Sequence, residues 1–130
     1  MSAPFIYVGT YEVSEGRFDE ARQSLAGAVE FIEANEPRMI SFNIYGNEDA
    51  GIISILQVHP DSASMDFHMK LVAEHISSAL EPYLGSAVGA QVFGEGPSTV
   101  DTILSFADPD AALAVAPEHI GGFTRTTVRS

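Results

Sequence analysis

The sequence predicts a single α+β domain in which two helices cover one face of a four-stranded antiparallel sheet. Three observations support this prediction. The chain has 130 residues, a length that suits one domain with one core. Apolar residues alternate along four short segments and recur at helical spacing along two longer ones. Proline, glycine and turn-forming residues separate these segments, and their order along the chain is β-α-β-β-α-β.

The first half of this pattern is a strand followed by an amphipathic helix. Residues 5–12, FIYVGTYE, are β-branched and aromatic with few charges on either alternating side, which indicates a strand covered on both faces. A helix is expected between Ser14, a suitable N-cap, and Pro37, which ends it. Its apolar stripe consists of Phe18, Ala21, Leu25, Ala28, Val29 and Ile32.

The second half begins with a hairpin. Residues 38–46 and 51–59 alternate as strands around the turn sequence NEDAG, and Pro60 ends the second of them. Ser62 or Ser64 is expected to cap a helix over residues 64–81. The apolar stripe of that helix is Met65, Met69, Val72, Ile76 and Leu80. A fourth strand is predicted over residues 86–96.

This element order is that of a ferredoxin-like domain over residues 1–96, with two helices on one sheet face. Apolar side chains on both faces of the strands predict that a second copy of the chain covers the other face, as a homodimer. Residues 97–130 are expected to be a C-terminal extension that packs on its own domain or on the partner subunit. A short helix is predicted there from Asp108 to Ala114, and GEGPST, 94–99, is interpreted as a turn with no helix after it.

Composition excludes several classes of function. The net charge is −12, from 18 acidic and 6 basic side chains, so nucleic-acid and membrane-surface partners are not expected. The chain has no cysteine, which excludes disulfides, thiolate metal sites and cysteine nucleophiles. No apolar run is long enough to span a bilayer, and the N-terminus lacks the basic segment of a secretion signal, so a cytoplasmic protein is expected.

Two passages support a family resemblance over residues 4–95. The entry to the second strand, NEPRMISFNIY, and the strand-to-helix passage QVHPDSASMDFHM resemble the antibiotic biosynthesis monooxygenase-like group of dimeric α+β barrels. The resemblance implies a homodimer with a small pocket between sheet and helices in each subunit. It also implies oxidation of electron-rich aromatic molecules without metal or flavin, or isomerisation or cyclisation of small molecules. A related branch binds and degrades haem, but this chain has no tryptophan and departs from that branch.

Three of the four histidines lie in residues 59–75 and are the candidate proton-transfer groups. His68 and His75 flank the apolar stripe of the second helix, and His59 ends the third strand. His68 and His59 are the candidate catalytic residues, with His75 as a candidate ligand-binding residue. The alternative is that each is structural and hydrogen-bonded. A metal site is not expected, because their spacings lack the i, i+3 or i, i+4 pairing of ligands on one helix face.

Other polar residues complete the candidate site. Asn43 and Gln57 lie in otherwise apolar strands, where an unpaired amide costs about 1–3 kcal/mol, so a ligand, water or neighbouring side chain is expected to satisfy them. Tyr7 is a further ligand-binding candidate, and Arg38 is expected to pair with Glu36 or another nearby acid. The leading hypothesis is a homodimer that binds a small apolar or aromatic molecule, with cofactor-independent monooxygenase or isomerase chemistry. The alternatives are a non-catalytic ligand-binding or interaction dimer, and a haem-binding protein.

Overall fold

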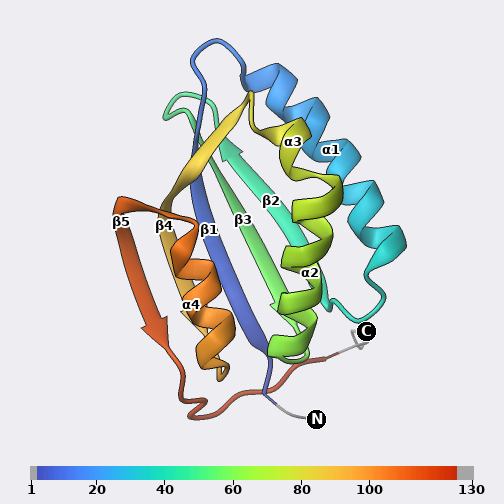
Figure 1. Cartoon of the computed structure of the whole chain (residues 1–130), viewed down its shortest axis with the longest axis vertical. Helices are drawn as coiled ribbons and strands as arrows, with labels where there is room; N and C mark the ends of the chain where they lie inside the picture. Colours follow the sequence, from blue (N-terminus) through green and yellow to red (C-terminus); the bar gives the residue numbers. More distant parts are fainter. Residues whose placement is uncertain (1–2, 126–130) are drawn as a thin grey trace.

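The computed structural model describes residues 3–125 and forms a five-stranded sheet with helices packed on one side of it (Figure 1). In chain order the elements are β1 (Phe5–Val13), α1 (Phe18–Asn35), β2 (Ser41–Asn47), β3 (Ile52–His59), α2 (Ser62–His75), α3 (Ser77–Leu80), β4 (Leu84–Phe93), α4 (Pro97–Ser105) and β5 (Ala107–Ala116). No helix among residues 3–125 is long and apolar enough to cross a membrane.

The sheet confirms the predicted ferredoxin-like arrangement. Its strand order is β2-β3-β1-β4-β5, and the first four strands pair antiparallel. The central pair sets the register that matters for the site, because Tyr7 on β1 lies directly opposite Gln57 on β3. Residues directly opposite on neighbouring strands point to the same face of the sheet. Both side chains are buried.

The core lies between the sheet and the helices. Alternate residues of β1 and β3 point toward the helices and are buried, among them Phe5, Tyr7, Ile53 and Ile55. Ala21 and Leu25 of α1 pack on Ile53 and Ile55, as the predicted apolar stripe requires. A separate cluster joins β1 and β4 to Met65 of α2 and Ile103 of α4. These two clusters lie on either side of a central gap between the sheet and the helices.

The C-terminal region differs from two predictions. Residues 107–116 form the strand β5, parallel to β4, where a short helix from Asp108 was expected. The GEGPST segment leads directly into α4, where a turn without a following helix was expected. Pro97 occupies the first helical turn, where proline is well tolerated, and Thr99 and Ile103 of α4 are buried. Once α4 has packed, the chain returns beside β4, whose free edge supplies backbone partners to an alanine-rich segment.

The second helix also differs from its expected limits. Asp61 is its N-cap, and the Asp61 carboxylate accepts a hydrogen bond from the Ser64 backbone N–H at 2.9 Å, where Ser62 or Ser64 was the predicted cap. The predicted helix 64–81 is divided at Ile76, between α2 and α3. Ile76 itself is buried and belongs to a cluster with Ala28 and Ile32 of α1. The helix is thus interrupted at a residue that packs against α1. Helical spacing in the sequence did not indicate this interruption.

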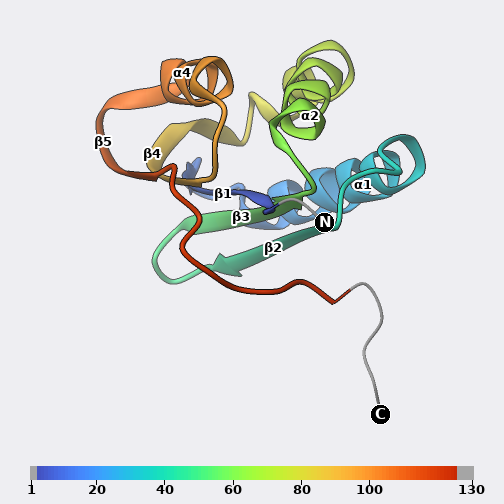
Figure 2. The same ribbon diagram turned by 90° about the horizontal axis from the view of Figure 1, so that it is seen from below.

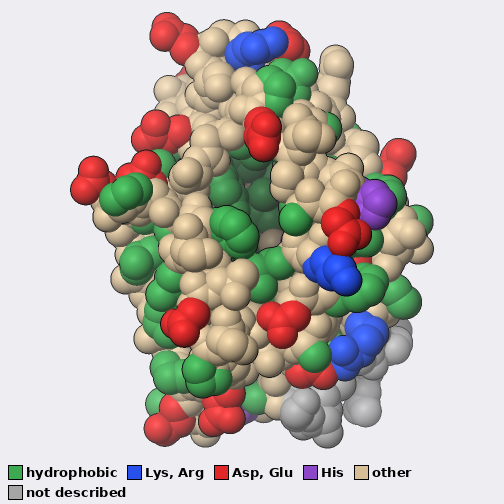
Figure 3. All heavy atoms as spheres, viewed as in Figure 1, with side chains coloured by type: hydrophobic (Ala, Val, Ile, Leu, Met, Phe, Trp, Pro, Cys, Tyr) green, Lys and Arg blue, Asp and Glu red, His purple; other side chains and the backbone are tan. Residues whose placement is uncertain are grey.

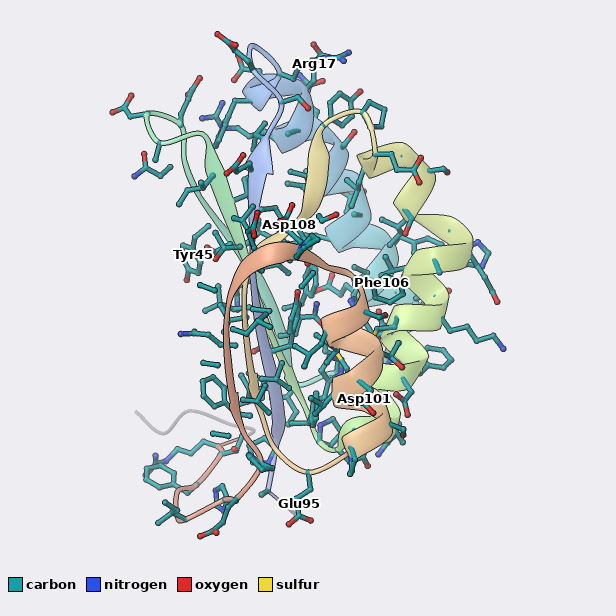
Figure 4. The ribbon with its side chains drawn as sticks, turned by 60° about the vertical axis from the view of Figure 1, so that its left-hand side comes forward. Arg17, Tyr45, Glu95, Asp101, Phe106 and Asp108 are labelled. Atoms are coloured by element: carbon teal, nitrogen blue, oxygen red, sulfur yellow. The ribbon has the colours of Figure 1, made fainter. Side chains whose placement is uncertain are left out.

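The face of the sheet away from the helices remains partly apolar. Ile6, Val8, Leu56 and Val58 point to this face and are half-buried, whereas Tyr45 on β2 is 65% exposed and projects from the same side (Figure 4). The C-terminal segment runs past this side of the sheet (Figure 2). This face therefore has no helical layer over it, whereas α2 and α4 cover the opposite one.

Candidate functional site

A cavity of about 530 Å³ lies in the central gap between the sheet and the helices. In the space-filling view it appears as a hollow with hydrophobic side chains on its walls (Figure 3). No lysine or arginine lines it among residues 3–125, so it is suited to a neutral ligand. Its polar lining comprises Tyr7, Tyr11, Gln57, His68, Ser77, Glu81 and Ser86. Its apolar walls include Leu25, Ile32, Phe42, Met65, Met69, Val72 and Phe106.

His68 is the histidine that α2 places on the cavity wall. Its side chain is buried, and its Nδ1 lies 2.7 Å from Oε2 of Glu36. Glu36 is the C-cap residue of α1, immediately before Pro37, and the following proline restricts its backbone to an extended conformation. The Glu36 side chain is only 2% exposed. A residue expected to pair with Arg38 at the surface is therefore inside the protein, and Arg38 pairs with Asp61 instead.

The second nitrogen of His68 has no hydrogen-bond partner in the described chain. Within residues 3–125, Glu36 Oε1 is the one fully enclosed side-chain nitrogen or oxygen that lacks a partner. His68 Nε2 also makes no hydrogen bond among those residues, but it keeps some accessible surface. Because His68 lines the cavity, Nε2 is the ring nitrogen that remains available to a ligand there, whereas Nδ1 is occupied by Glu36.

His59 is hydrogen-bonded inside the protein, as the structural alternative expected. It is fully buried, and it does not line the cavity. Its Nε2 lies 3.0 Å from Oε1 of Gln57, and its Nδ1 lies 2.8 Å from the hydroxyl of Ser64. The amide oxygen can only accept, so His59 Nε2 carries the hydrogen and Nδ1 accepts from Ser64. Burial, together with the neighbouring His68, lowers the pKa of His59 from 6.5 to about 4.

Gln57 connects His59 to the cavity. Its oxygen is occupied by His59, which leaves the amide N–H₂ group as a donor. This nitrogen has no partner within the described chain and keeps some accessible surface, and Gln57 is among the residues that line the cavity. The chain Ser64–His59–Gln57 therefore orients an amide donor toward a ligand. His68 is close to this chain, with its ring centroid 5.7 Å from that of His59.

Two tyrosines on β1 supply a second polar group in the cavity. The hydroxyls of Tyr7 and Tyr11 are 3.0 Å apart and hydrogen-bond to each other. Burial is the main cause of the raised pKa of both, so both stay neutral. Only one of the two hydroxyl hydrogens is used between them, which leaves the other for a ligand or water. The pair lies over Gly9, where an added Cβ would come within 2.3 Å of the Tyr7 oxygen.

The other predicted site residues lie outside this cavity. Asn43 was expected to point inward, but it is exposed on the sheet face opposite to the helices, because its neighbours Phe42 and Ile44 take the inward positions of β2. His75 was expected to face the sheet, but its side chain is 51% exposed and its ring contacts Phe31. Neither residue lines the cavity. No cluster of three or more potential metal-ligating side chains occurs in residues 3–125.

Glu36 is the site residue that sequence reasoning missed. Its neighbour Arg38 made a surface ion pair the natural expectation. The available signal was its position between the last turn of a helix and a proline, two residues before a predicted strand, where the chain must turn back toward the core. Side-chain direction at such a turn depends on the backbone angles, which the sequence pattern does not supply.

Fold and site together define a ferredoxin-like α+β protein with a ligand-sized cavity between sheet and helices. Solved structures with this fold include antibiotic biosynthesis monooxygenase proteins, as the sequence resemblance implied. A candidate antibiotic biosynthesis monooxygenase from Chloroflexus aurantiacus J-10-fl superimposes with a TM-score of 0.55 at 15% identity, over 69% of this chain and 90% of its own. A further antibiotic biosynthesis monooxygenase has a TM-score of 0.56 at 14% identity, over 72% and 99%.

The similarity extends further along the chain in one structure. MupZ from Pseudomonas fluorescens has a TM-score of 0.72 at 19% identity and covers all of this chain and 95% of its own. The alignment with MupZ therefore includes α4 and β5, the elements that the ferredoxin-like pattern does not predict. At these identities the similarity shows the fold. No protein-family model and no curated protein matches the sequence.

Proposed function

We propose that this protein binds a small, neutral, largely apolar or aromatic molecule in the cavity and that His68 transfers a proton to and from it. One observation carries the proposal: His68 lines a largely apolar cavity with an unbonded Nε2, while its Nδ1 is held by Glu36. A proton acceptor in a largely apolar cavity that neutral donors also line suits removal of an acidic C–H or O–H proton. Gln57 and Tyr7 would orient the ligand oxygen.

This chemistry agrees with the names of the similar solved structures, which include antibiotic biosynthesis monooxygenases. Proton removal from an electron-rich phenol or activated carbon makes the carbanion or phenolate that reacts with oxygen in a cofactor-independent monooxygenase. The same proton, returned to another atom, gives an isomerase. We favour these two reaction types, and binding without catalysis is the alternative that the following test separates.

The proposal predicts hydrogen–deuterium exchange in a model compound. 2-Tetralone is neutral and bicyclic and has an acidic methylene group beside its carbonyl. In heavy water, His68 would take a proton from that carbon, this proton would exchange with a deuteron of the solvent, and His68 would return the deuteron to the carbon. We expect saturable exchange above the buffer rate, measured by NMR. Because general-base catalysis contributes about 10²–10⁴-fold, His68→Gln should lose at least tenfold of that rate.

Two tryptophan variants provide the control for the cavity. Ala73 is exposed but lines the cavity, so Ala73→Trp should fill its mouth and abolish the exchange. Ala79 is also exposed and does not line the cavity, so Ala79→Trp should leave the exchange unchanged. Saturable binding of 2-tetralone without exchange would favour the non-catalytic binding protein. Absence of binding would contradict the proposal, and a shift of the Soret band when haem is added to the protein would support the haem-binding alternative instead.

We also propose that the protein is a homodimer whose subunits join through the sheet face that has no helical layer. Half-buried Val8, Leu56 and Val58 with exposed Tyr45 make this face partly apolar, and a second sheet would remove it from water. Light scattering after size exclusion should give twice the chain mass. Tyr45→Glu should shift that mass toward the monomer, whereas Phe67→Glu, an exposed aromatic on the helical side, should not. A monomeric wild-type protein would contradict this proposal.

A further inference from the structure

Glu36 and His68 form a buried pair whose geometry indicates which of the two side chains donates the hydrogen bond between them. The distance between Glu36 Oε2 and His68 Nδ1 is 2.7 Å, within the range of hydrogen bonds to an ionised carboxylate. Both side chains are buried. Phe42 lies beside the imidazole at a ring distance of 5.7 Å, and His59 lies at the same distance. Within residues 3–125, Glu36 is the hydrogen-bond partner of this ring.

The electrostatic environment of Glu36 also favours a hydrogen bond from His68 to the Glu36 carboxylate. Glu36 is the C-cap of α1, so the carboxylate lies at the negative end of the helix dipole. No arginine or lysine is paired with it among residues 3–125, since Arg38 contacts Asp61. The imidazolium that forms when His68 takes a proton from a ligand is therefore the positive group that can compensate this negative charge. The unpartnered Glu36 Oε1 is costly, and such atoms in native structures are associated with functional sites.

We infer that Glu36 is a positioning residue that holds His68 in the Nδ1–H form, with the lone pair of Nε2 directed into the cavity. A carboxylate can only accept, so the hydrogen of a neutral His68 stays on Nδ1. When Nε2 takes a proton from a C–H or O–H group, the ring becomes an imidazolium beside the Glu36 carboxylate, and the ligand becomes an enolate or phenolate. The proton later returns from Nε2. This role rests on the proposed function, because positioning matters only if His68 is the base.

The tautomer of His68 can be measured without any ligand. Nitrogen-15 NMR of the full chain distinguishes protonated from unprotonated imidazole nitrogens, and the His68→Gln spectrum assigns the signals. At about pH 8, where an ordinary imidazole is neutral, we expect Nδ1 protonated and Nε2 unprotonated. A protonated Nε2 in the wild-type protein would overturn the inference, whether it came from the other tautomer or from a persistent imidazolium.

Two variants of Glu36 separate positioning from simple packing. Glu36→Met has a similar length but no acceptor, so His68 should shift toward the Nε2–H form. Exchange of 2-tetralone should then fall at least tenfold, the lower range for loss of a partner that orients a histidine. Glu36→Gln keeps an oxygen that can accept from Nδ1 and should retain the wild-type tautomer. An unchanged tautomer in Glu36→Met would overturn the inference.

The two readouts distinguish failure of the inference from failure of the proposed function. If the tautomer depends on Glu36 as expected but 2-tetralone neither binds nor exchanges, the proposed function fails while the structural role of Glu36 stands. If exchange occurs and depends on His68, but the tautomer does not respond to Glu36→Met, the inference fails alone. If Glu36→Met does not fold, the wild-type tautomer still decides between the two forms.

Discussion

Replacing His68 by leucine should lower the free energy of unfolding by about 3–5 kcal/mol, because a buried Glu36 carboxylate would lose its partner. Both side chains are nearly inaccessible to solvent, and the hydrogen bond between them is short. Leucine occupies a comparable volume, so the expected loss comes from leaving the buried carboxylate without its hydrogen-bond donor. Urea unfolding monitored by circular dichroism gives the measurement.

The double variant tests whether this loss belongs to the pair. Glu36→Leu combined with His68→Leu removes both buried polar groups, and such replacements are often neutral or stabilising. We therefore expect the double variant to recover most of the stability that His68→Leu loses, as a coupling between contacting residues. His75→Leu on the same helix is the matched control. Its side chain is half exposed, so the expected change is within about 0.5 kcal/mol. A loss below about 1 kcal/mol in His68→Leu would contradict the buried pair.

Acidification from pH 6.5 to 4 should destabilise the protein through His59. Burial lowers the pKa of His59 in the folded state to about 4, against 6.5 as the ordinary value. In this interval the unfolded chain takes up a proton at His59 that the folded protein does not, so unfolding becomes more favourable as the pH falls. The contribution is present in full above pH 6.5 and levels off below 4, and it amounts to about 2–3 kcal/mol.

Comparison of variants isolates this contribution. His59→Gln cannot be protonated in this range, so its stability should depend less steeply on pH between 6.5 and 4. Urea midpoints at several pH values provide the comparison. Parallel profiles of the wild-type protein and His59→Gln would show that His59 is accessible to protons in the folded state.

Both histidines illustrate why residue type alone did not distinguish their roles. His68 and His59 were both candidates for proton transfer, and each has an imidazole in a mostly apolar segment. The structure gives His59 two hydrogen bonds inside the protein and gives His68 one bond and one open nitrogen. We therefore propose His68 as the base and His59 as the residue that orients Gln57. This difference depends on contacts between β3, α1 and α2, which are separate in the sequence.

The sequence by itself determined the ferredoxin-like core and one face of the site. Alternation and helical spacing are local properties of the chain, so β1 to β4, α1 and most of α2 could be predicted, together with Tyr7, Gln57 and His68 as inward-facing residues. The inward orientation expected for Asn43 and His75 was wrong, because strand and helix faces have limits that only packing reveals. Asn43 follows the inward Phe42, and His75 lies at the end of α2, where its ring meets Phe31 near solvent.

The tertiary structure decided the C-terminal elements and the electrostatics of the site. Residues 107–116 form a strand because the edge of β4 offers them backbone hydrogen bonds. The alanine-rich sequence of this segment does not indicate that pairing. Glu36 turned inward because the chain reverses at Pro37 and brings the end of α1 against α2. In both cases the deciding energy comes from partners distant in sequence. The free edge of β4 and the buried His68 exist only in the folded protein, so a local sequence pattern does not indicate them.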